Sequence, residues 1–215
     1  MKSKIFWFSA AVMLLAFGNA AAEPFRSRAQ PERARTWVID AGELFLEQAG
    51  QPRRAITLPD WQWAGQRYAC APDIALGPRG EVVVTSNVMP VLWKVDPETL
   101  KVSVHRLELD SDTDKDVGFS GLVYSARNGA YFAVSGPHGS LWRIDPLLRR
   151  AQKVGLSQSL RGACAMSVQR QARPSVFSRL CVRGESVSLA PDQRSAYVQS
   201  AGCSSNAFAL IGGSQ

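Results

Sequence analysis

The amino-acid sequence predicts an all-β fold built from a repeated four-stranded unit, and two observations lead to this prediction. The hexapeptide LWKVDP at Leu92–Pro97 returns almost unchanged as LWRIDP at Leu141–Pro146, a step of 49 residues. A constant step of this length is typical of repeat architectures. Within each unit, β-branched and aromatic residues alternate with polar ones, and the runs end at Gly, Pro, Asn or Asp, as strands and turns do.

The best-defined unit places four strands at about Ile74–Leu76, Val82–Ser86, Val91–Val95 and Leu100–Leu109. An Asp-Pro pair follows the third strand in both copies of the hexapeptide, and it favours a tight turn into the fourth strand. The tryptophan in the third strand is large and flat enough to fill the gap between neighbouring sheets. Four short strands at a constant step favour a β-propeller blade over the alternative, a β-sandwich of unrelated strands.

The units at the two ends are less regular. Residues Thr36–Pro59 read as the second, third and fourth strands of a unit whose innermost strand is lacking, and Ser186–Gly212 read as the first three strands of the last unit. We therefore expect a β-propeller-like array of about four four-stranded blades, the first and last incomplete, over residues 36–215. Either the two ends complete each other's sheets, or the array stays open and an oligomeric partner completes it.

The first 22 residues have the order of a secretory signal peptide. Lys2 and Lys4 precede the apolar stretch Ile5–Phe17, and small residues then allow cleavage after Ala22. The alternative is an uncleaved anchor, but the apolar stretch is shorter than the about 18 residues that a membrane span needs. We expect a periplasmic or secreted protein with a flexible segment at residues 23–35 and no transmembrane segment after signal removal.

The chain is basic, with a formal net charge of +7. Its arginines and lysines are spread along the sequence and form no run of five or more. Nucleic-acid binding prefers a stripe or cluster of such residues, so we expect no nucleic-acid partner.

The four cysteines all lie beyond the signal peptide, at Cys70, Cys164, Cys181 and Cys203. An even number of cysteines in an oxidising compartment most simply forms two disulfides, and three connectivities are open. The alternative, a zinc site made of four thiolates, lacks the C-x-x-C pairs that are typical of such sites.

Blade topology places the connections between strands on two rims. The first, which we call the short-turn rim, carries the short turns GPRG, ARNG, DPET and DPLL. The other, the long-loop rim, carries the connections Pro59–Pro72, Asp110–Gly121 and Ser157–Glu185, and the turns Ser86–Pro90 and Ser135–Ser140. Binding sites usually lie on such long loops, and the cysteines fall on this rim. They either clamp a binding surface or stabilise a small, imperfect propeller.

Three side chains of the long-loop rim are candidate ligand contacts. Trp61 and Trp63 are two residues apart, so they lie on one side of an extended segment. They predict an aromatic platform for a sugar or peptide, and the alternative is packing over the first blade. His138 could serve as a general base, although no nucleophile or orienting carboxylate stands at a matching spacing.

Alternating carboxylates make the segment DSDTDKD a candidate calcium site, with Asp110, Asp112, Asp114 and Asp116 as ligands. Calcium prefers six to eight oxygen ligands, which loop carboxylates supply well. The segment departs from an EF-hand loop, because Lys115 replaces the required glycine and Gly121 the bidentate glutamate. The alternative is a solvated acidic turn. We predict no other cofactor.

The pattern PDIALxxxGxVxVTSN followed by LWKVDP resembles blades of the NHL-repeat, YVTN and gluconolactonase-like propellers. The resemblance is good over Pro72–Leu109 and fair over Leu122–Leu156. The gluconolactonase-like family implies a divalent metal held by acidic and asparagine side chains in a central channel. Asn87 matches such a ligand, but its counterpart one step later is Gly136, and the first blade has no matching glutamate.

These observations predict an exported, disulfide-stabilised binding or scaffold protein that uses its long-loop rim. Its partner would be an exported protein or a small ligand. The sequence favours a non-enzymatic role. The alternatives are a metal-dependent lactonase-like hydrolase centred on Asn87 and a partial propeller that an oligomeric partner completes.

Overall fold

The structure is a computed structural model that describes residues 26–40, 43–64, 70–110, 118–169, 178–182 and 184–199. These residues form seventeen β-strands and one short 3-10 helix, η1 (Pro31–Arg33). The predicted signal peptide lies outside the described residues. No helix among the described residues is long and apolar enough to cross a bilayer.

The strands form four successive four-stranded antiparallel blades. Blade 1 has the order β1 (Arg26–Gln30), β2 (Arg35–Asp40), β3 (Glu43–Gln48) and β4 (Arg54–Ile56). Blade 2 has the order β5 (Ile74–Leu76), β6 (Val82–Thr85), β7 (Val91–Val95) and β8 (Val102–Arg106). The strands predicted for this unit are confirmed to within a few residues.

Blades 3 and 4 join through their outer strands into one continuous sheet. Blade 3 comprises β10 (Gly121–Ser125), β11 (Ala130–Ser135), β12 (Ser140–Ile144) and β13 (Arg150–Leu156). Blade 4 comprises β14 (Met166–Val168), β15 (Ser178–Val182), β16 (Glu185–Leu189) and β17 (Ser195–Gln199). The end of β13 pairs in parallel with β17, and the short β9 (Glu108–Leu109) pairs with the start of β13.

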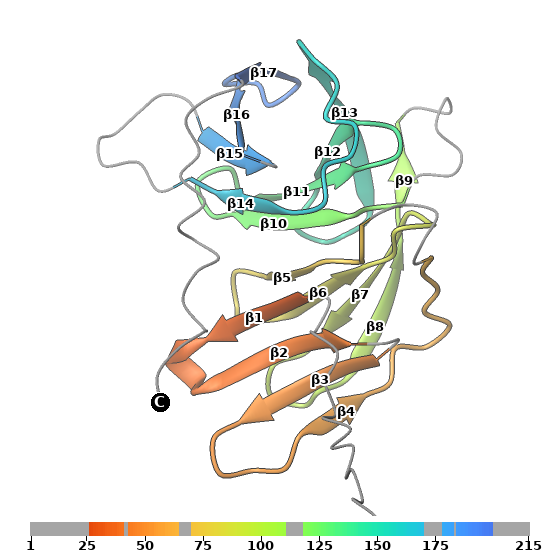
Figure 1. Ribbon diagram of the computed structural model, residues 1–215, viewed down its shortest axis with the longest axis vertical. Coiled ribbons are helices and arrows are strands. Elements are labelled where there is room, and N and C mark those ends of the chain that lie inside the picture. Colours follow the sequence, from red (N-terminus) through yellow and green to blue (C-terminus); the bar gives the residue numbers. More distant parts are fainter. Residues whose placement is uncertain are drawn as a thin grey trace, which may run out of the picture.

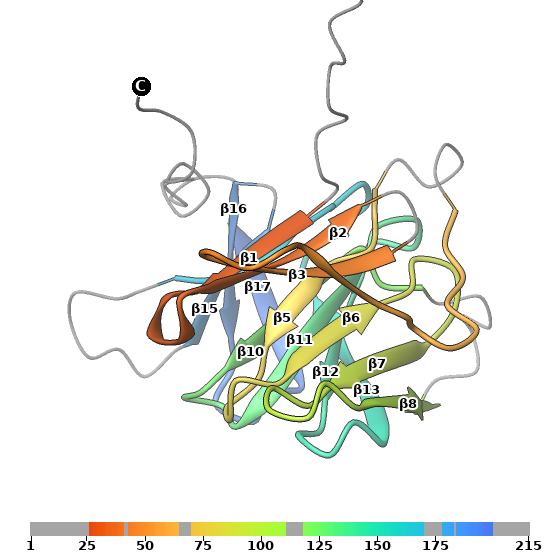
Figure 2. The same cartoon turned by 90° about the horizontal axis from the view of Figure 1, so that it is seen from below.

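The four blades follow one another along an arc, with β1, β5, β10 and β14 on its inner side (Figure 1). Seen from below, the strands of blade 1 lie across those of blade 2 (Figure 2). The order of the blades in space is therefore their order in the sequence, as in a β-propeller.

Three apolar clusters hold consecutive blades together. Trp37 and Trp93 are buried in the cluster between blades 1 and 2, and Tyr131 and Trp142 in the cluster between blades 2 and 3. The third cluster joins blades 3 and 4. The repeated tryptophans Trp93 and Trp142 thus each pack against the preceding blade, which confirms the role that their sequence position predicts.

The structure corrects the prediction for both terminal blades. The first blade has its innermost strand, β1, which pairs along its whole length with β2 and lies within the segment expected to be flexible. The last blade takes its two inner strands, β14 and β15, from the segment expected to be a long loop. The strands read as its first and second are its third and fourth. Alternating arginines in RSRAQ concealed β1, because they leave no apolar period.

Candidate functional site

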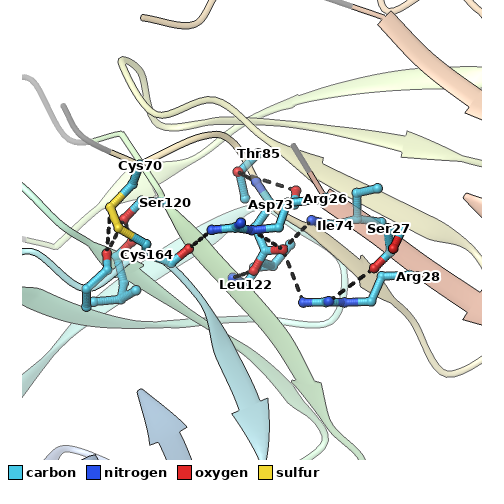
Figure 3. Close-up of polar contacts among 12 residues, drawn as sticks. Arg26, Ser27, Arg28, Cys70, Asp73, Ile74, Thr85, Ser120, Leu122 and Cys164 are labelled. Atoms are coloured by element: carbon cyan, nitrogen blue, oxygen red, sulfur yellow. Dashed lines mark hydrogen bonds and ion pairs between the residues drawn. A yellow bond between two sulfur atoms is a disulfide. The ribbon is translucent and has the colours of Figure 1, made fainter. Parts of the chain in front are cut away.

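The innermost strands all begin at the long-loop rim, so the residues that start them converge. Asp73 directly precedes β5, Arg26 and Arg28 lie in β1, and Cys164 precedes β14. Figure 3 shows these side chains together with the disulfide between Cys70 and Cys164. We call this group of residues, together with Ser120, the axial cluster.

Asp73 is the centre of the axial cluster and is fully buried. Its Oδ1 atom lies 3.1 Å from Arg28 Nη2 and 3.6 Å from Arg26 Nε. The backbone N–H of Ile74 donates to Oδ1 at 2.9 Å, and the N–H of Leu122 donates to Oδ2 at 2.9 Å. One carboxylate therefore binds blade 1, its own blade 2 and blade 3.

Burial raises the pKa of Asp73 above its ordinary value, because desolvation disfavours the charged form. The charge of Arg28, the N–H of Leu122 and the charge of Arg26 oppose this effect in that order. The two arginine side chains remain about a fifth exposed, at 22% and 21%, whereas the carboxylate of Asp73 between them is fully buried.

The fourth blade joins this cluster through the disulfide loop. Arg26 Nη2 donates to the carbonyl of Cys164, and Ser120 Oγ donates to Ala163 O at 2.8 Å. A Cβ atom at Gly136 would lie 2.8 Å from Ala163 O and 3.4 Å from Cys70 Sγ. Glycine at this position thus lets the disulfide loop approach blade 3 closely.

Asn87, the candidate metal ligand, is 1% exposed and has a structural role. Its Nδ2 donates to Ala64 O at 2.6 Å and Cys70 O at 2.8 Å, and its Oδ1 accepts from Ala64 N at 2.9 Å. Both the oxygen and the nitrogen of the side-chain amide are thus engaged in hydrogen bonds to the backbone of Ala64 or Cys70. The alternative of a lactonase-like metal centre on Asn87 is therefore not favoured.

Trp61 packs against the core between blades 1 and 2, and its Nε1 donates to Thr85 O at 2.9 Å. Trp63 lies beside it, with ring centroids 6.5 Å apart and a tilt of 36°. Both rings are half-buried. Packing thus accounts for Trp61, and a ligand platform on the remaining exposed parts of the pair stays a prediction.

A hollow of about 530 Å³ opens on the long-loop rim of blade 3 and brings two predicted site residues together. It is lined by Asp110, His138, Gly139, Ser140, Lys153, Val154, Gly155, Leu156 and Ser159. Asp110 Oδ1 accepts from the backbone N–H of Lys153 at 2.8 Å, which holds the carboxylate at the wall.

The loop that carries Ser159 holds the turn that carries His138. Leu160 N donates to Gly139 O at 2.9 Å, and Gly162 N donates to Gly136 O at 2.8 Å. Gly139 has a φ of +67°, and a Cβ atom there would lie 2.6 Å from Arg161 N. The floor of the hollow is therefore fixed by contacts between loops that are far apart in the sequence.

Several of the predicted residues lie outside the described part of the chain. Asp112, Asp114 and Asp116 are among them, so the calcium site stays a prediction. Within the described residues, no three metal-ligating side chains gather. Cys181 lies on β15 and is disulfide-bonded, whereas Cys203 lies outside the described residues, and their pairing also stays a prediction.

The sequence did not predict Arg26, Arg28 or Asp73 as site residues. The arginines fall in the segment expected to be flexible, and a single aspartate before a strand has no distinctive spacing. One signal was present: Asp73 and Leu122 are equivalent across the 49-residue step, and the carboxylate binds the N–H of its own counterpart.

Comparison with known proteins places the fold. No protein-family model matches the chain, and no curated protein matches it by sequence. Among solved structures, virginiamycin B lyase from Staphylococcus aureus, determined with quinupristin, has a TM-score of 0.58 at 13% identity, over 82% of this chain and 55% of that chain.

Two further solved structures are similar over most of this chain. An auxiliary nutrient binding protein from Bacteroides thetaiotaomicron has a TM-score of 0.54 at 12% identity, over 84% of this chain and 43% of that chain. The nidogen/laminin complex has a TM-score of 0.52 at 11% identity, over 82% of this chain and 68% of that chain.

The fold is of the β-propeller type. The resemblance to NHL-like and YVTN-like propellers is confirmed at the level of structure. This chain spans about half the length of the lyases that it matches, at 55% and 50%. Identities this low establish the fold and leave the activity to be argued from the site.

Proposed function

We propose that this protein is an exported, disulfide-stabilised binding protein that takes a small polar ligand in the hollow beside His138. The observation that carries the proposal is the joint presence of His138 and Asp110 on the walls of one hollow. Lys153, Ser140 and Ser159 add an ammonium group and two hydroxyls. A lining with both charges and several hydroxyls suits a small molecule with donors and acceptors, such as an amino acid or a monosaccharide.

Preorganisation supports binding at this rim. The disulfide, the axial cluster and Asn87 fix the described parts of the rim around Cys70, Cys164 and Leu122 against one another, so these parts have little conformational freedom left to lose when a ligand binds. Neighbours with this fold include both a lyase and a nutrient-binding protein, so the fold alone does not decide between catalysis and binding.

The test uses the two histidines of the chain, His105 and His138, as reporters. Ring resonances are recorded by NMR while mixtures of free amino acids and of monosaccharides are added. We expect one class to shift His138 and leave His105 unchanged, and Asp110→Asn to weaken that binding about tenfold. The proposal fails if neither class shifts His138, or if Asp110→Asn and wild type bind equally.

Export is supported by the order of the first 22 residues and by the disulfide. Expression of the full chain followed by N-terminal sequencing of the periplasmic or secreted fraction tests it. We expect a mature protein that begins at Glu23. A product that retains Met1 and stays with the membrane would favour the uncleaved anchor.

A second role is that of a partial propeller whose ring is completed by another copy of this chain. One observation supports it. In the described residues, three apolar clusters join four blades, and none of them joins blade 4 to blade 1. A ring has as many blade interfaces as blades, so an arc of this kind presents two end faces. Light scattering of the mature protein tests this role, and a monomer at all concentrations would refute it.

A further inference from the structure

A second hollow, of about 660 Å³, lies on the short-turn rim beneath blades 1 and 2. It is bounded by the β5–β6 and β7–β8 turns of blade 2 and by Arg33 of blade 1. Its lining is Arg33, Arg79, Glu81, Lys94, Asp96, Pro97, Glu98, Thr99, Lys101, Val102 and Ser103. The function proposed above uses the opposite rim and leaves this hollow unexplained.

The walls of this hollow are held by contacts between the two blades. Arg33 Nη1 forms an ion pair with Glu98 Oε1, and Arg35 Nη1 donates to Pro97 O at 2.9 Å. Gln30, which is fully buried, donates from Nε2 to Gly80 O at 3.2 Å. The hollow is therefore a feature of the blade 1–2 junction.

Each acidic side chain of the lining already has donors. Glu98 is paired with Arg33, and Glu81 accepts from Arg79 N at 2.8 Å. Asp96 Oδ1 accepts from Glu98 N at 3.0 Å, Thr99 N at 2.8 Å and Thr99 Oγ1 at 2.9 Å. These carboxylates stabilise the turns that form the walls.

The basic side chains of the lining, apart from Arg33, have no such charged partner in the part of the chain that the structure describes. Among the described residues, Arg79, Lys94 and Lys101 form no ion pair with a carboxylate, although all three line the hollow. Lys94 is half-buried and lies beside Ser103 across the β7–β8 pair. Three cations thus face one space without a counter-charge in contact.

We propose that this hollow binds the phosphate group of a small phosphate monoester, such as a sugar phosphate, through Arg79, Lys94 and Lys101. A dianionic phosphate offers three strong acceptor oxygens, which matches three cationic donors better than a single carboxylate does. The guanidinium of Arg79 binds two oxygens at once, while the ammonium groups act as point charges. The Ser103 hydroxyl lies within the same lining for contact with the ester.

His105 provides a local reporter of this site. Its Nε2 is hydrogen-bonded to Ser103 Oγ at 3.0 Å. Burial lowers the pKa of His105, the charge of Lys94 lowers it further, and Asp145 of blade 3 opposes them. A phosphate dianion beside Lys94 would offset that charge, so binding should raise the pKa of His105.

The experiment titrates the mature protein with glucose 6-phosphate at neutral pH while the NMR signals of both histidine rings are followed. The same signals are then recorded over a range of pH with and without glucose 6-phosphate. We expect saturable shifts of His105, an increase of its pKa and no shift of His138. Glucose should leave His105 unchanged, and glucuronate should bind this hollow about tenfold more weakly than glucose 6-phosphate.

Two variants and a matched control locate the site. Lys94→Gln and Arg79→Gln should each weaken glucose 6-phosphate binding about tenfold. Arg127→Gln removes the same charge from the equivalent turn of blade 3 and should bind as wild type does, because Arg127 does not line the hollow. The far-ultraviolet circular dichroism of each variant reports whether it is folded.

Several outcomes would overturn the proposal. They are the absence of any shift of His105, equal shifts of both histidines, equal binding of glucose or glucuronate, and an equal loss in Arg127→Gln. A shift of His138 alone would instead assign the phosphate ester to the long-loop rim.

Discussion

The two rims of this protein are held together in different ways. On the long-loop rim, the contacts join residues far apart in the chain: the disulfide spans 94 residues, and Asp73 binds Leu122 across 49. On the short-turn rim, Asp96 and Asp145 accept hydrogen bonds from residues no more than five positions away. Asp73 thus connects three blades from a fully buried position, whereas Asp96 and Asp145 close their own turns. The short-turn rim also has contacts between blades 1 and 2, but the ion pair of Arg33 with Glu98 among them is exposed.

This difference separates two consequences of mutation. A change on the long-loop rim should loosen the blades from one another and lower the stability of the whole domain. A change at Asp96 or Asp145 should act within one blade, because these carboxylates accept hydrogen bonds from their own turns.

The disulfide between Cys70 and Cys164 should contribute most. Its 94-residue loop restricts the unfolded chain by about 4.7 kcal/mol in the loop-entropy relation. We expect the double variant Cys70→Ser, Cys164→Ser to lose about 4–5 kcal/mol of unfolding free energy in urea titrations. A loss below about 1 kcal/mol would show that the long-loop rim does not connect the blades as described.

Removal of the central carboxylate should follow. Asp73→Ala leaves the N–H groups of Ile74 and Leu122 without an acceptor and Arg26 and Arg28 without a counter-charge. We expect a loss of about 3–4 kcal/mol in the same titration, because each unsatisfied buried donor costs about 1–3 kcal/mol. Asp73→Asn is the control: it keeps one acceptor oxygen and has no charge to desolvate, so its loss should be smaller. Equal losses would contradict this account.

Two glycines with positive φ compare the rims directly. Gly139 on the long-loop rim has a φ of +67° and backbone within 2.6 Å of a built Cβ, whereas Gly129 on the short-turn rim has a φ of +58° and nothing within 4 Å. Gly129→Ala should cost about 1 kcal/mol from backbone strain alone. Gly139→Ala should cost about 2–3 kcal/mol, since crowding adds to the strain. Equal melting temperatures for the two variants would remove the contrast.

The sequence predicted the fold where the repeat is regular. The 49-residue step located the strands of blades 2 and 3, and Trp93 and Trp142 fill blade interfaces as their positions predict. It misplaced β1 and β14, because β1 carries no apolar alternation and β14 is only three residues long. Arg26 and Arg28 point at the buried carboxylate of Asp73, which offsets their charge. Asp73 is far from them in the sequence, so this pairing can be recognised only in the folded structure.

The sequence predicted only the rim on which candidate site residues should lie. The structure brings His138 and Asp110, both predicted for the long-loop rim, to one hollow, and their role in binding stays a prediction. Asn87 was predicted as a metal ligand from the resemblance to gluconolactonase-like propellers, yet its side-chain amide is hydrogen-bonded to the backbone of Ala64 and Cys70. Spacing along a strand indicates which rim a side chain occupies, but not which backbone groups a folded loop will offer to it.

The smallest effects, and the most specific, should come from acid titration of one aspartate on each rim. The N–H groups of the turn at Thr99 hold the pKa of Asp96 below its ordinary value of 3.8. Asp96 therefore contributes stability that is present above pH 3.8 and is lost as the pH falls through its folded pKa. In Asp96→Asn this acid loss should disappear, so the variant and wild type should converge in unfolding free energy at low pH.

Asp73 should show the opposite sign. Burial raises its pKa, so its contribution is present below pH 3.8 and is lost as the pH rises through the folded pKa. The difference in unfolding free energy between wild type and Asp73→Asn should therefore shift in favour of wild type on acidification, while the difference for Asp96→Asn shifts against it. Urea titrations between neutral pH and pH 3 measure both differences. Shifts of the same sign would mean that the two carboxylates share one environment, and the distinction between an aspartate that connects blades and one that closes its own turn would fail.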